Sequence, residues 1–229
     1  MVETAIVVGA SSGIGRATAL ALAAEGVRVM AAARREEKLR ELPGVEICPT
    51  DVTDRSQVER LISTTLDKLG RIDLLVYATG ENIPARAMKV LTPEIWDMML
   101  AVNLTGAFNC THAVLGSMRA AGGGLIVYIS TISVHAPDVS GAAYQASKHG
   151  LSGLAHATRL EEKQNGIRTS VIFPGLCKTD MVNKRPAPTP KEVLDLALDP
   201  EDVAAVVVAL ARLNPRAVVP EMELVPSRL

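Results

Sequence analysis

The stretch "TAIVVGASSGIGRATALALAAEG", residues 4–26, joins a short apolar run to a helical pattern through a turn that contains Gly9, Gly13 and Gly15. A glycine turn between a strand and a helix lets backbone N–H groups and the positive helix end approach a phosphate, because no Cβ intervenes. A plain tight turn would use the same glycines. The stretch therefore predicts the first strand and helix of an α/β sheet, with a candidate phosphate-binding turn between them.

The same alternation continues along the chain. Short apolar runs rich in β-branched residues are separated by stretches with helical periodicity. These runs are "TAIVVGA", "VRVMAAA", "VEICPT", "IDLLVYA", "GLIVYIS" and "IRTSVIFPG". Runs that are apolar on both faces predict a parallel sheet with helices on both sides. A length of 229 residues suits one domain, so we expect a single doubly wound α/β domain over residues 1–229.

Composition excludes several classes of protein. The chain is 48 % hydrophobic and 21 % charged with a formal charge of −1, which is ordinary for a globular protein and argues against a nucleic-acid partner. Cys48, Cys110 and Cys177 form no C-x-x-C pair, so neither a disulfide framework nor a metal site is predicted. The start "MVETAIVVGA" is not predicted to be a secretory signal, and we find no apolar run of about 18 residues. We expect a cytoplasmic protein with no membrane partner.

A second motif is "YQASKHG", residues 144–150. Residues four apart lie on the same face of a helix, so Tyr144 and Lys148 can approach a common point. Taken alone, the pair is more typical of an ordinary helix surface, because a four-residue pattern occurs often by chance.

Three rival functions use related folds or motifs. A phosphate-binding NTPase loop needs Lys-Ser or Lys-Thr after its last glycine, whereas this chain has Ile14, Gly15 and Arg16. A methyltransferase would bind an adenosine cofactor on a similar sheet but gives no use to Tyr144 and Lys148. No Ser-His-Asp order with a nucleophile turn indicates a hydrolase.

An ordered set of motifs resembles the short-chain dehydrogenase/reductase family. The set comprises G-x-x-x-G-x-G, "VNL" around Asn103, a hydroxyl cluster after "GLIVYIS", Y-x-x-x-K, and "PG" followed by "TDM". It covers the chain from Thr4 to about Pro220 and is far more specific than any one motif. The resemblance implies a doubly wound sheet of seven parallel strands with a nicotinamide dinucleotide across their carboxyl ends.

The resemblance also implies catalytic roles. Tyr144 would exchange a proton with the carbonyl or alcohol oxygen as hydride is transferred. A free tyrosine titrates near pH 10, so acting as a base near pH 7 requires a shift of about three units, or roughly 4 kcal/mol. A cation about 4 Å away at an effective dielectric of 20 supplies about that much, and Lys148 is expected to be that cation.

Two further polar residues complete the implied machinery. The family has a serine thirteen positions before the tyrosine, where this chain has Thr131, and Ser133 is the alternative hydroxyl. We favour Thr131, although its methyl group restricts rotation. Asn103 resembles the asparagine that connects the lysine to solvent through water, although a structural asparagine that bends a helix is the alternative.

Cofactor contacts are implied at the glycine turn and at the loops after later strands. The residues are Gly9, Ser11, Ser12, Gly13, Ile14, Gly15, Arg34, Arg35, Asp51, Val52, Ala78, Thr79, Gly80, Tyr144, Lys148, Pro174, Gly175, Leu176 and Thr179. The chain departs from the family at Val8, where threonine is usual, and at "YATG" (77–80), where "NNAG" is usual. These departures affect hydrogen bonds of the scaffold more than the chemistry.

The segment "AAARREEKL" favours NADP(H) over NAD(H). NAD-preferring relatives carry an acidic residue at the end of the second strand, where this chain has Ala33. Arg34, with Arg35 close by, could bind a 2′-phosphate through charge-assisted hydrogen bonds. The alternative is a solvated start of a helix. Ser12 stands where many NADP-preferring relatives have a basic residue.

We therefore expect an oxidoreductase acting on a small carbonyl compound or secondary alcohol. A member that binds dinucleotide but serves only as a regulator or scaffold is the alternative. Residues 181–199 resemble the substrate loop of the family. With 3 % aromatic residues, the pocket is expected to be lined by Met, Leu, Val and Ile, and His135 is a candidate for its wall.

Assembly into a homodimer or homotetramer is also implied by the resemblance. The helix expected from Tyr144 to Glu162 carries Leu151, Leu154 and Ala155 at near-helical spacing. Packing against the sheet would explain the same stripe.

Overall fold

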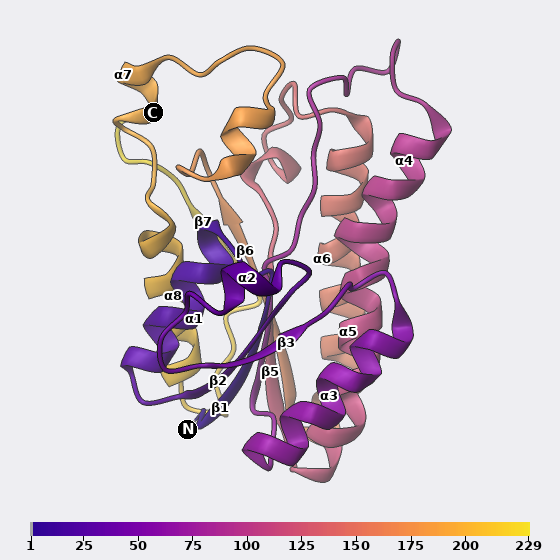
Figure 1. Cartoon of the computed structure of the whole chain (residues 1–229), viewed down its shortest axis with the longest axis vertical. Helices are drawn as coiled ribbons and strands as arrows, with labels where there is room; N and C mark the ends of the chain where they lie inside the picture. Colours follow the sequence, from indigo (N-terminus) through magenta and orange to yellow (C-terminus); the bar gives the residue numbers. More distant parts are fainter. Residues whose placement is uncertain (1) are drawn as a thin grey trace.

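Each apolar run forms a strand in the computed structural model, which describes residues 2–229 (Figure 1). All strand pairs are parallel, in the order β3-β2-β1-β4-β5-β6-β7. The strands are β1 (Thr4–Val8), β2 (Arg28–Ala33), β3 (Glu46–Pro49), β4 (Leu74–Tyr77), β5 (Gly124–Ile129), β6 (Ile167–Pro174) and β7 (Glu221–Leu224). The expected doubly wound sheet of seven parallel strands in one domain is confirmed.

Helices fill the connections between strands. The longer ones are α1 (Gly13–Ala24), α3 (Arg55–Leu69), α4 (Pro93–Leu100), α5 (Gly106–Ala120), α6 (Ala142–Glu162) and α8 (Pro200–Arg212). The short elements are α2 (Glu36–Leu39), α7 (Lys191–Leu194), the π-helical turn η1 (Ala101–Thr105) and the 3₁₀ turns η2 (Ile132–Val134), η3 (Lys163–Asn165) and η4 (Asp180–Lys184).

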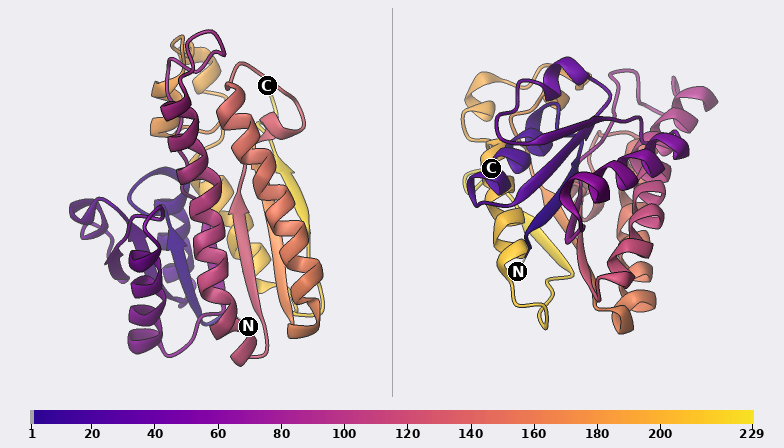
Figure 2. Two further views of the ribbon diagram at one scale, coloured as in Figure 1. Left: turned by 90° about the vertical axis from the view of Figure 1, so that its right-hand side faces the viewer. Right: turned by 60° about the horizontal axis from the view of Figure 1, so that its bottom comes forward.

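Both faces of the sheet are covered because successive strand residues point to opposite sides and nearly all are apolar. In β1, Ile6 and Val8 belong to one core, whereas Ala5 and Val7 belong to the other. The first core is completed by α3, α5 and α6, and the second by α1, α2 and α8. Figure 2 shows the two helical layers on either side of the sheet.

Strand β7 does not correspond to any of the six apolar runs that predicted strands in the sequence. Its residues, "EMEL", alternate between exposed and half-buried positions, which is the pattern of an edge strand. A four-residue alternation of this kind is too short to stand out in the sequence. Pairing with β6, which places Val171 opposite Glu221, brings the segment into the sheet.

One helix is long and apolar enough to resemble a membrane span, although charged and polar residues interrupt its apolar residues. Pro93–Ala120 is one continuous helix of 28 residues with an 18-residue window of mean hydropathy 1.2, which meets the length and composition of a membrane span. In the fold it lies as one layer beside the sheet, and 44 % of that window is buried inside the protein. Met99, Cys110, Val114 and Met118 are among its buried residues, so core packing accounts for its apolar character.

The apolar stripe on α6 belongs to the core. Leu151 and Ala155 are fully buried, and Leu154 packs against the same cluster. The stripe therefore carries no argument for subunit contact, and assembly stays a prediction.

Candidate active site

A cavity of about 1160 Å³ lies at the carboxyl ends of the strands. Its position follows from topology, because β1 lies between β2 and β4 and the loops leaving β1 and β4 diverge to opposite sides of the sheet. Nearly every predicted site residue lines it. The exceptions are Gly15 and Asn103, which lie behind the wall.

Close backbone packing explains two glycines of the first turn. Gly9 has a φ of +91°, and a Cβ there would lie 2.8 Å from the backbone carbon of Ala78. A Cβ on Gly15 would lie 2.3 Å from the carbonyl oxygen of Gly9. Gly15 therefore lets the first turn of α1 pack on the end of β1. Gly13, Ile14 and Ser11 line the cavity beside them.

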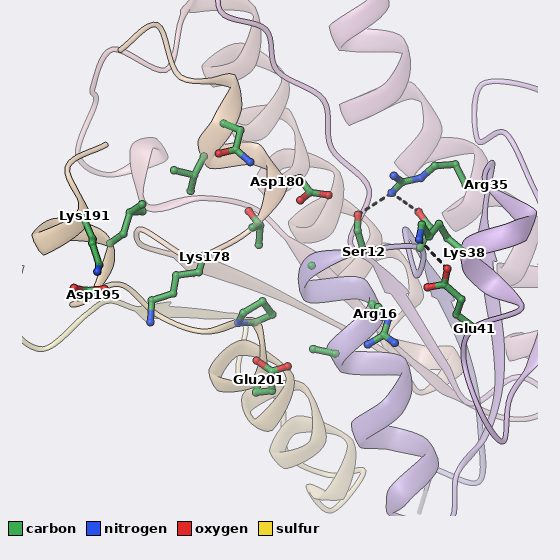
Figure 3. Close-up of a pocket in the computed structure, with 18 residues that line it drawn as sticks. Ser12, Arg16, Arg35, Lys38, Glu41, Lys178, Asp180, Lys191, Asp195 and Glu201 are labelled. Carbon is green, nitrogen blue, oxygen red and sulfur yellow. Dashed lines mark hydrogen bonds and ion pairs between the residues drawn. The ribbon is translucent and has the colours of Figure 1, made fainter. Parts of the chain in front are cut away.

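Arg35 reaches back to the glycine turn. Its guanidinium donates hydrogen bonds to the hydroxyls of Ser11 and Ser12, each at 3.0 Å. Figure 3 shows Arg35 pointing at Ser12 across the start of α1. The Arg35 guanidinium therefore lies at the N-terminal end of α1, where the helix dipole is also positive. No acidic residue in the first turn of α1 offsets this positive charge.

The two arginines of this segment are placed differently. Arg34 is exposed and lines the cavity, but Arg35 is the residue that contacts the turn. Arg35 places a positive charge beside Ser12, which occupies the position where many NADP-preferring relatives carry a basic residue. Ala33 is buried at the end of β2 and offers no carboxylate to a ribose hydroxyl.

A second hollow of about 780 Å³ opens on the other side of the glycine turn and shares part of its wall with the main cavity, including Ser12, Arg35 and Thr179. Its rim carries both signs of charge, as the labelled side chains in Figure 3 show. Lys38, for example, pairs with Glu41 at 2.7 Å. Positive charge dominates at the glycine-turn end of this hollow, where Arg16 and Arg35 lie, and the acidic residues Asp195 and Glu201 lie on its other side.

The loop after β3 forms another part of the wall. Asp51 accepts hydrogen bonds from the backbone N–H and hydroxyl of Thr53 at 2.9 and 2.7 Å. Val52 is buried, and its carbonyl accepts a hydrogen bond from Asn109 at 2.9 Å. Both residues line the cavity, where Asp51 keeps an oxygen available.

The loop after β4 approaches the catalytic candidates at Gly80. A Cβ on Gly80 would lie 3.3 Å from Lys148 Nζ and 3.8 Å from Asn103 Oδ1. Ala78 is anchored to β1 through a hydrogen bond to the Val8 carbonyl, and Ala78 and Thr79 line the cavity. The opposite wall comes from Pro174, Gly175, Leu176 and Thr179 after β6.

Tyr144 and Lys148 meet on the first turns of α6, but the lysine does not bind the phenol. Lys148 is buried, its Nζ donates to the Ile129 carbonyl at 3.0 Å, and it lies 5.9 Å from the centre of the Tyr144 ring. Burial lowers the pKa of Lys148 to about 8 and raises the pKa of Tyr144 to about 12. Desolvation is the largest influence on the pKa of the Tyr144 phenol, so the structure gives no support to a pKa near 7, and that expectation stays a prediction.

The two candidate hydroxyls occupy different places. Thr131 interacts with the Tyr144 phenol and lowers its pKa. Ser133 is buried behind it, 3.3 Å from Thr131 Oγ1 and 3.3 Å from Ser140 Oγ. The geometry brings Thr131, rather than Ser133, to the tyrosine.

Asn103 lies in the π-helical turn η1, fully buried. Its Oδ1 accepts from the Glu81 N–H at 2.6 Å, and its Nδ2 donates to the Glu81 carbonyl and to Ser147 Oγ, each at 3.0 Å. The amide therefore ties the loop after β4 to α6, beside Lys148.

The substrate side of the cavity is more polar than expected. Glu81, Arg86, Asp138, Lys184 and Arg185 line it, together with Met181, Val182, Val193 and the prolines of the 181–199 segment. Apolar side chains of Met181, Val182 and Val193 are present as expected, but they share the lining with these charged groups. Sequence reasoning missed these charged residues because their loops have no regular pattern.

His135 is also placed elsewhere. Its Nδ1 lies 2.6 Å from Glu223 of β7, and its ring packs on Phe173 with centroids 4.3 Å apart. The cavity wall does not include it.

Comparison with known proteins finds a matching protein family and several similar proteins. Residues 3–189 match the family model of short chain dehydrogenases. An uncharacterized oxidoreductase of Staphylococcus haemolyticus is 33 % identical over 219 residues, covering 92 % of this chain and 91 % of that protein. A 3-oxoacyl-[acyl-carrier-protein] reductase of Synechocystis is 33 % identical over 220 residues, covering 91 % and 89 %.

Solved structures agree with the fold. An alcohol dehydrogenase of the archaeon Thermococcus sibiricus, complexed with 5-hydroxy-NADP, superposes with a TM-score of 0.89 at 26 % identity, covering 100 % of this chain and 98 % of that one. A metagenomic short-chain oxidoreductase in complex with NADP gives a TM-score of 0.84 at 31 % identity, covering 98 % and 97 %.

Proposed function

Because the chain belongs to the short-chain dehydrogenase/reductase family, we propose that it is an NADP(H)-dependent oxidoreductase that interconverts a small carbonyl compound and a secondary alcohol. Reduction is the favoured direction. The names of its relatives include an alcohol dehydrogenase and a 3-oxoacyl reductase, which supports this reaction class without selecting a substrate.

The residues present fit the cofactor. The cavity extends from Arg35 at the glycine turn to Tyr144 and, at about 1160 Å³, exceeds the range of about 300–1,000 Å³ typical of small-ligand pockets. At one end, Arg35, Ser11 and Ser12 form a cluster of donors suited to a 2′-phosphate. Next to it, the backbone at Gly13 and Ile14 would hold the pyrophosphate. Asp51 and Val52 would flank the adenine, and Gly80, Gly175 and Lys148 would border the nicotinamide riboside.

The chemistry assigned to the chain is proton transfer. When bound, the cofactor supplies the hydride that reduces the carbonyl carbon. Tyr144 donates its phenolic proton to the carbonyl oxygen, because its pKa of about 12 keeps it protonated at neutral pH. Thr131 orients the same oxygen by donating a hydrogen bond. Because Lys148 does not contact the phenol directly, it would return the lost proton through a bridging hydroxyl or water and recover its own proton from solvent, with Asn103 holding the loop that borders it.

The observation that carries the proposal is the meeting of Tyr144, Thr131 and Lys148 at one end of a cavity whose other end is built for phosphate. The test is to follow the absorbance of NADPH with a panel of ketones, oxo acids and aldehydes. We expect turnover with at least one substrate. Tight NADPH binding without any turnover would instead favour the regulator or scaffold.

We also propose a homodimer or homotetramer. Phe108 on α5 and Leu160 on α6 are large apolar side chains that stay 42 % and 58 % exposed, so they are available for such a contact. Light scattering at working concentration tests this, and a monomer would contradict it.

A further inference from the structure

Arg86 is a buried cation without an obvious structural partner. It is only 5 % exposed, yet its Nε finds no hydrogen-bond partner among residues 2–229. Asp138, the acid whose charge acts on it, instead accepts a hydrogen bond from the Ser140 N–H at 2.9 Å. A buried charge is costly unless it is paired and hydrogen-bonded. The environment of Arg86 is therefore incomplete, and Arg86 lines the active-site cavity.

The fold holds Arg86 in a defined place beside Tyr144. Gly141, the residue that precedes α6, has a φ of +91°, and a Cβ there would lie 2.8 Å from Arg86 Cβ. The stem of Arg86 thus packs on bare backbone three residues before the tyrosine. Asn82 fastens the two loops together by donating to the Ser140 carbonyl at 3.1 Å. Consistent with this proximity, Arg86 lowers the pKa of Tyr144.

We propose that Arg86 binds a carboxylate group of the substrate, so that the preferred substrates are oxo acids and the corresponding hydroxy acids. This inference rests on the function proposed above. A guanidinium matches a carboxylate with two parallel hydrogen bonds, and a site shielded from water strengthens them. Because Arg86 lies beside Tyr144, the carboxylate is separated from the reacting carbonyl by only a few carbon atoms.

The surroundings favour a carboxylate over a phosphate. Arg185 lines the same cavity and adds positive charge, but its Nη1 donates to Thr189 at 3.2 Å, and Lys184 is paired with Glu81. Asp138 adds a negative charge close to Arg86. Asp138 repels any anion, and it repels a dianion about twice as strongly as a monoanion, so one guanidinium beside one acid favours a carboxylate over a phosphate dianion.

The test compares each acid with its neutral ester. With NADPH, kcat/KM is measured for acetoacetate and 4-oxopentanoate and for their methyl esters. We expect the wild type to prefer the acid by at least tenfold. Arg86→Gln should lower kcat/KM for the acid about ten- to a hundredfold more than for the ester, the range for hydrogen bonds to charged groups. Any effect of Arg86 on Tyr144 alters both substrates and cancels in the ratio.

Matched variants separate binding from structure. Arg168 on β6 also has a buried Nε without a partner but does not line the cavity, so Arg168→Gln should leave the acid-to-ester ratio unchanged. Arg86→Lys should keep part of the preference. Asp138→Asn should raise or preserve it, because a competing negative charge is removed. If Arg86 served only to balance Asp138, both single variants would instead lower the melting temperature and leave the ratio intact.

A binding readout keeps this inference distinct from the proposed function. Pentanoate cannot be reduced, and calorimetry on the NADPH-saturated protein should detect its binding to the wild type and at least tenfold weaker binding to Arg86→Gln. Pentanoate binding without turnover of any carbonyl would refute the enzyme but keep the carboxylate site. Equal rates with acids and esters, equal losses for both in Arg86→Gln, or a preference for phosphate esters would overturn the inference.

Discussion

Lys148 Nζ donates a hydrogen bond to the Ile129 carbonyl at 3.0 Å and lies 5.9 Å from the centre of the Tyr144 ring. The lysine is thus held by the end of β5 and faces the tyrosine without binding its oxygen. Burial then acts on the two groups in opposite directions, raising the pKa of the phenol and lowering that of the ammonium. The raised pKa keeps the Tyr144 phenol protonated at neutral pH, as its proposed role as proton donor in carbonyl reduction requires.

The first prediction concerns that donor. Tyr144→Phe removes the phenolic proton and leaves the ring, so turnover should fall by more than tenfold while the Kd for NADPH stays close to that of the wild type. Steady-state kinetics and fluorescence titration measure the two quantities. Retention of more than a tenth of the activity would show that the acid is a different group.

The two hydroxyls can be separated in the same assay. Thr131→Ala should lower kcat by about a hundredfold, because a donor to the carbonyl oxygen is lost. Ser133→Ala should have a much smaller effect, since Ser133 contacts Thr131 and Ser140 rather than the tyrosine. A larger loss for Ser133→Ala would reverse the assignment.

Lys148 makes the activity and the stability depend on pH. Its pKa of about 8 predicts that kcat/KM for reduction falls above about pH 8, as the ammonium that resupplies Tyr144 loses its proton. The phenol remains protonated throughout this range. A profile measured from pH 6 to 10 tests this, and a flat profile would contradict it.

Lys148 makes the folding stability depend on pH in the opposite direction from the activity. The unfolded lysine titrates near 10.4 and the folded one near 8, so the unfolded chain binds more protons between these values and stability rises with pH there. Below pH 8 the burial of the charge costs about 3 kcal/mol. Lys148→Met should therefore stabilise the cofactor-free protein at pH 7 by about 1–2 kcal/mol, after about 1 kcal/mol is lost with the hydrogen bond. Denaturant unfolding at pH 7 should show this gain, and destabilisation would contradict it.

Cofactor preference should depend on Arg35 more than on Arg34. The wild type is expected to favour NADPH over NADH in kcat/KM by roughly ten- to a few hundredfold, from one or two charge-assisted hydrogen bonds. Arg35→Ala should remove most of that preference, Arg34→Ala less of it, and Ala33→Asp should shift it toward NADH. If NADH serves the wild type equally well, the phosphate cluster is misassigned.

Two glycines provide a matched test of the scaffold. Gly15→Ala would place a Cβ 2.3 Å from the Gly9 carbonyl oxygen and should destabilise the protein by about 2–3 kcal/mol. A Cβ on Gly153 in α6 would meet no atom within 4 Å, so Gly153→Ala should stabilise the protein by about 0.5–1 kcal/mol. Thermal unfolding of both variants checks the pair, and a harmless Gly15→Ala would contradict the packing.

The sequence by itself determined the features that depend on local spacing. Apolar strands that alternate with helices specify a parallel sheet that is covered on both faces. The glycine turn specifies a close approach between β1 and α1. Positions 144 and 148 lie on the same face of a helix because they are four residues apart, wherever that helix packs. The ordered motifs were sufficient to identify the family and most of the cavity wall.

The tertiary structure decided what depends on segments distant in the chain. It joined Arg35 to the glycine turn by hydrogen bonds, placed Thr131 rather than Ser133 against the Tyr144 phenol, and packed the Leu151 stripe into the core. It also buried Arg86 against Gly141. Such contacts arise where loops of different strands converge, and the direction of a side chain in an irregular loop follows from its packing partners rather than from a repeating pattern.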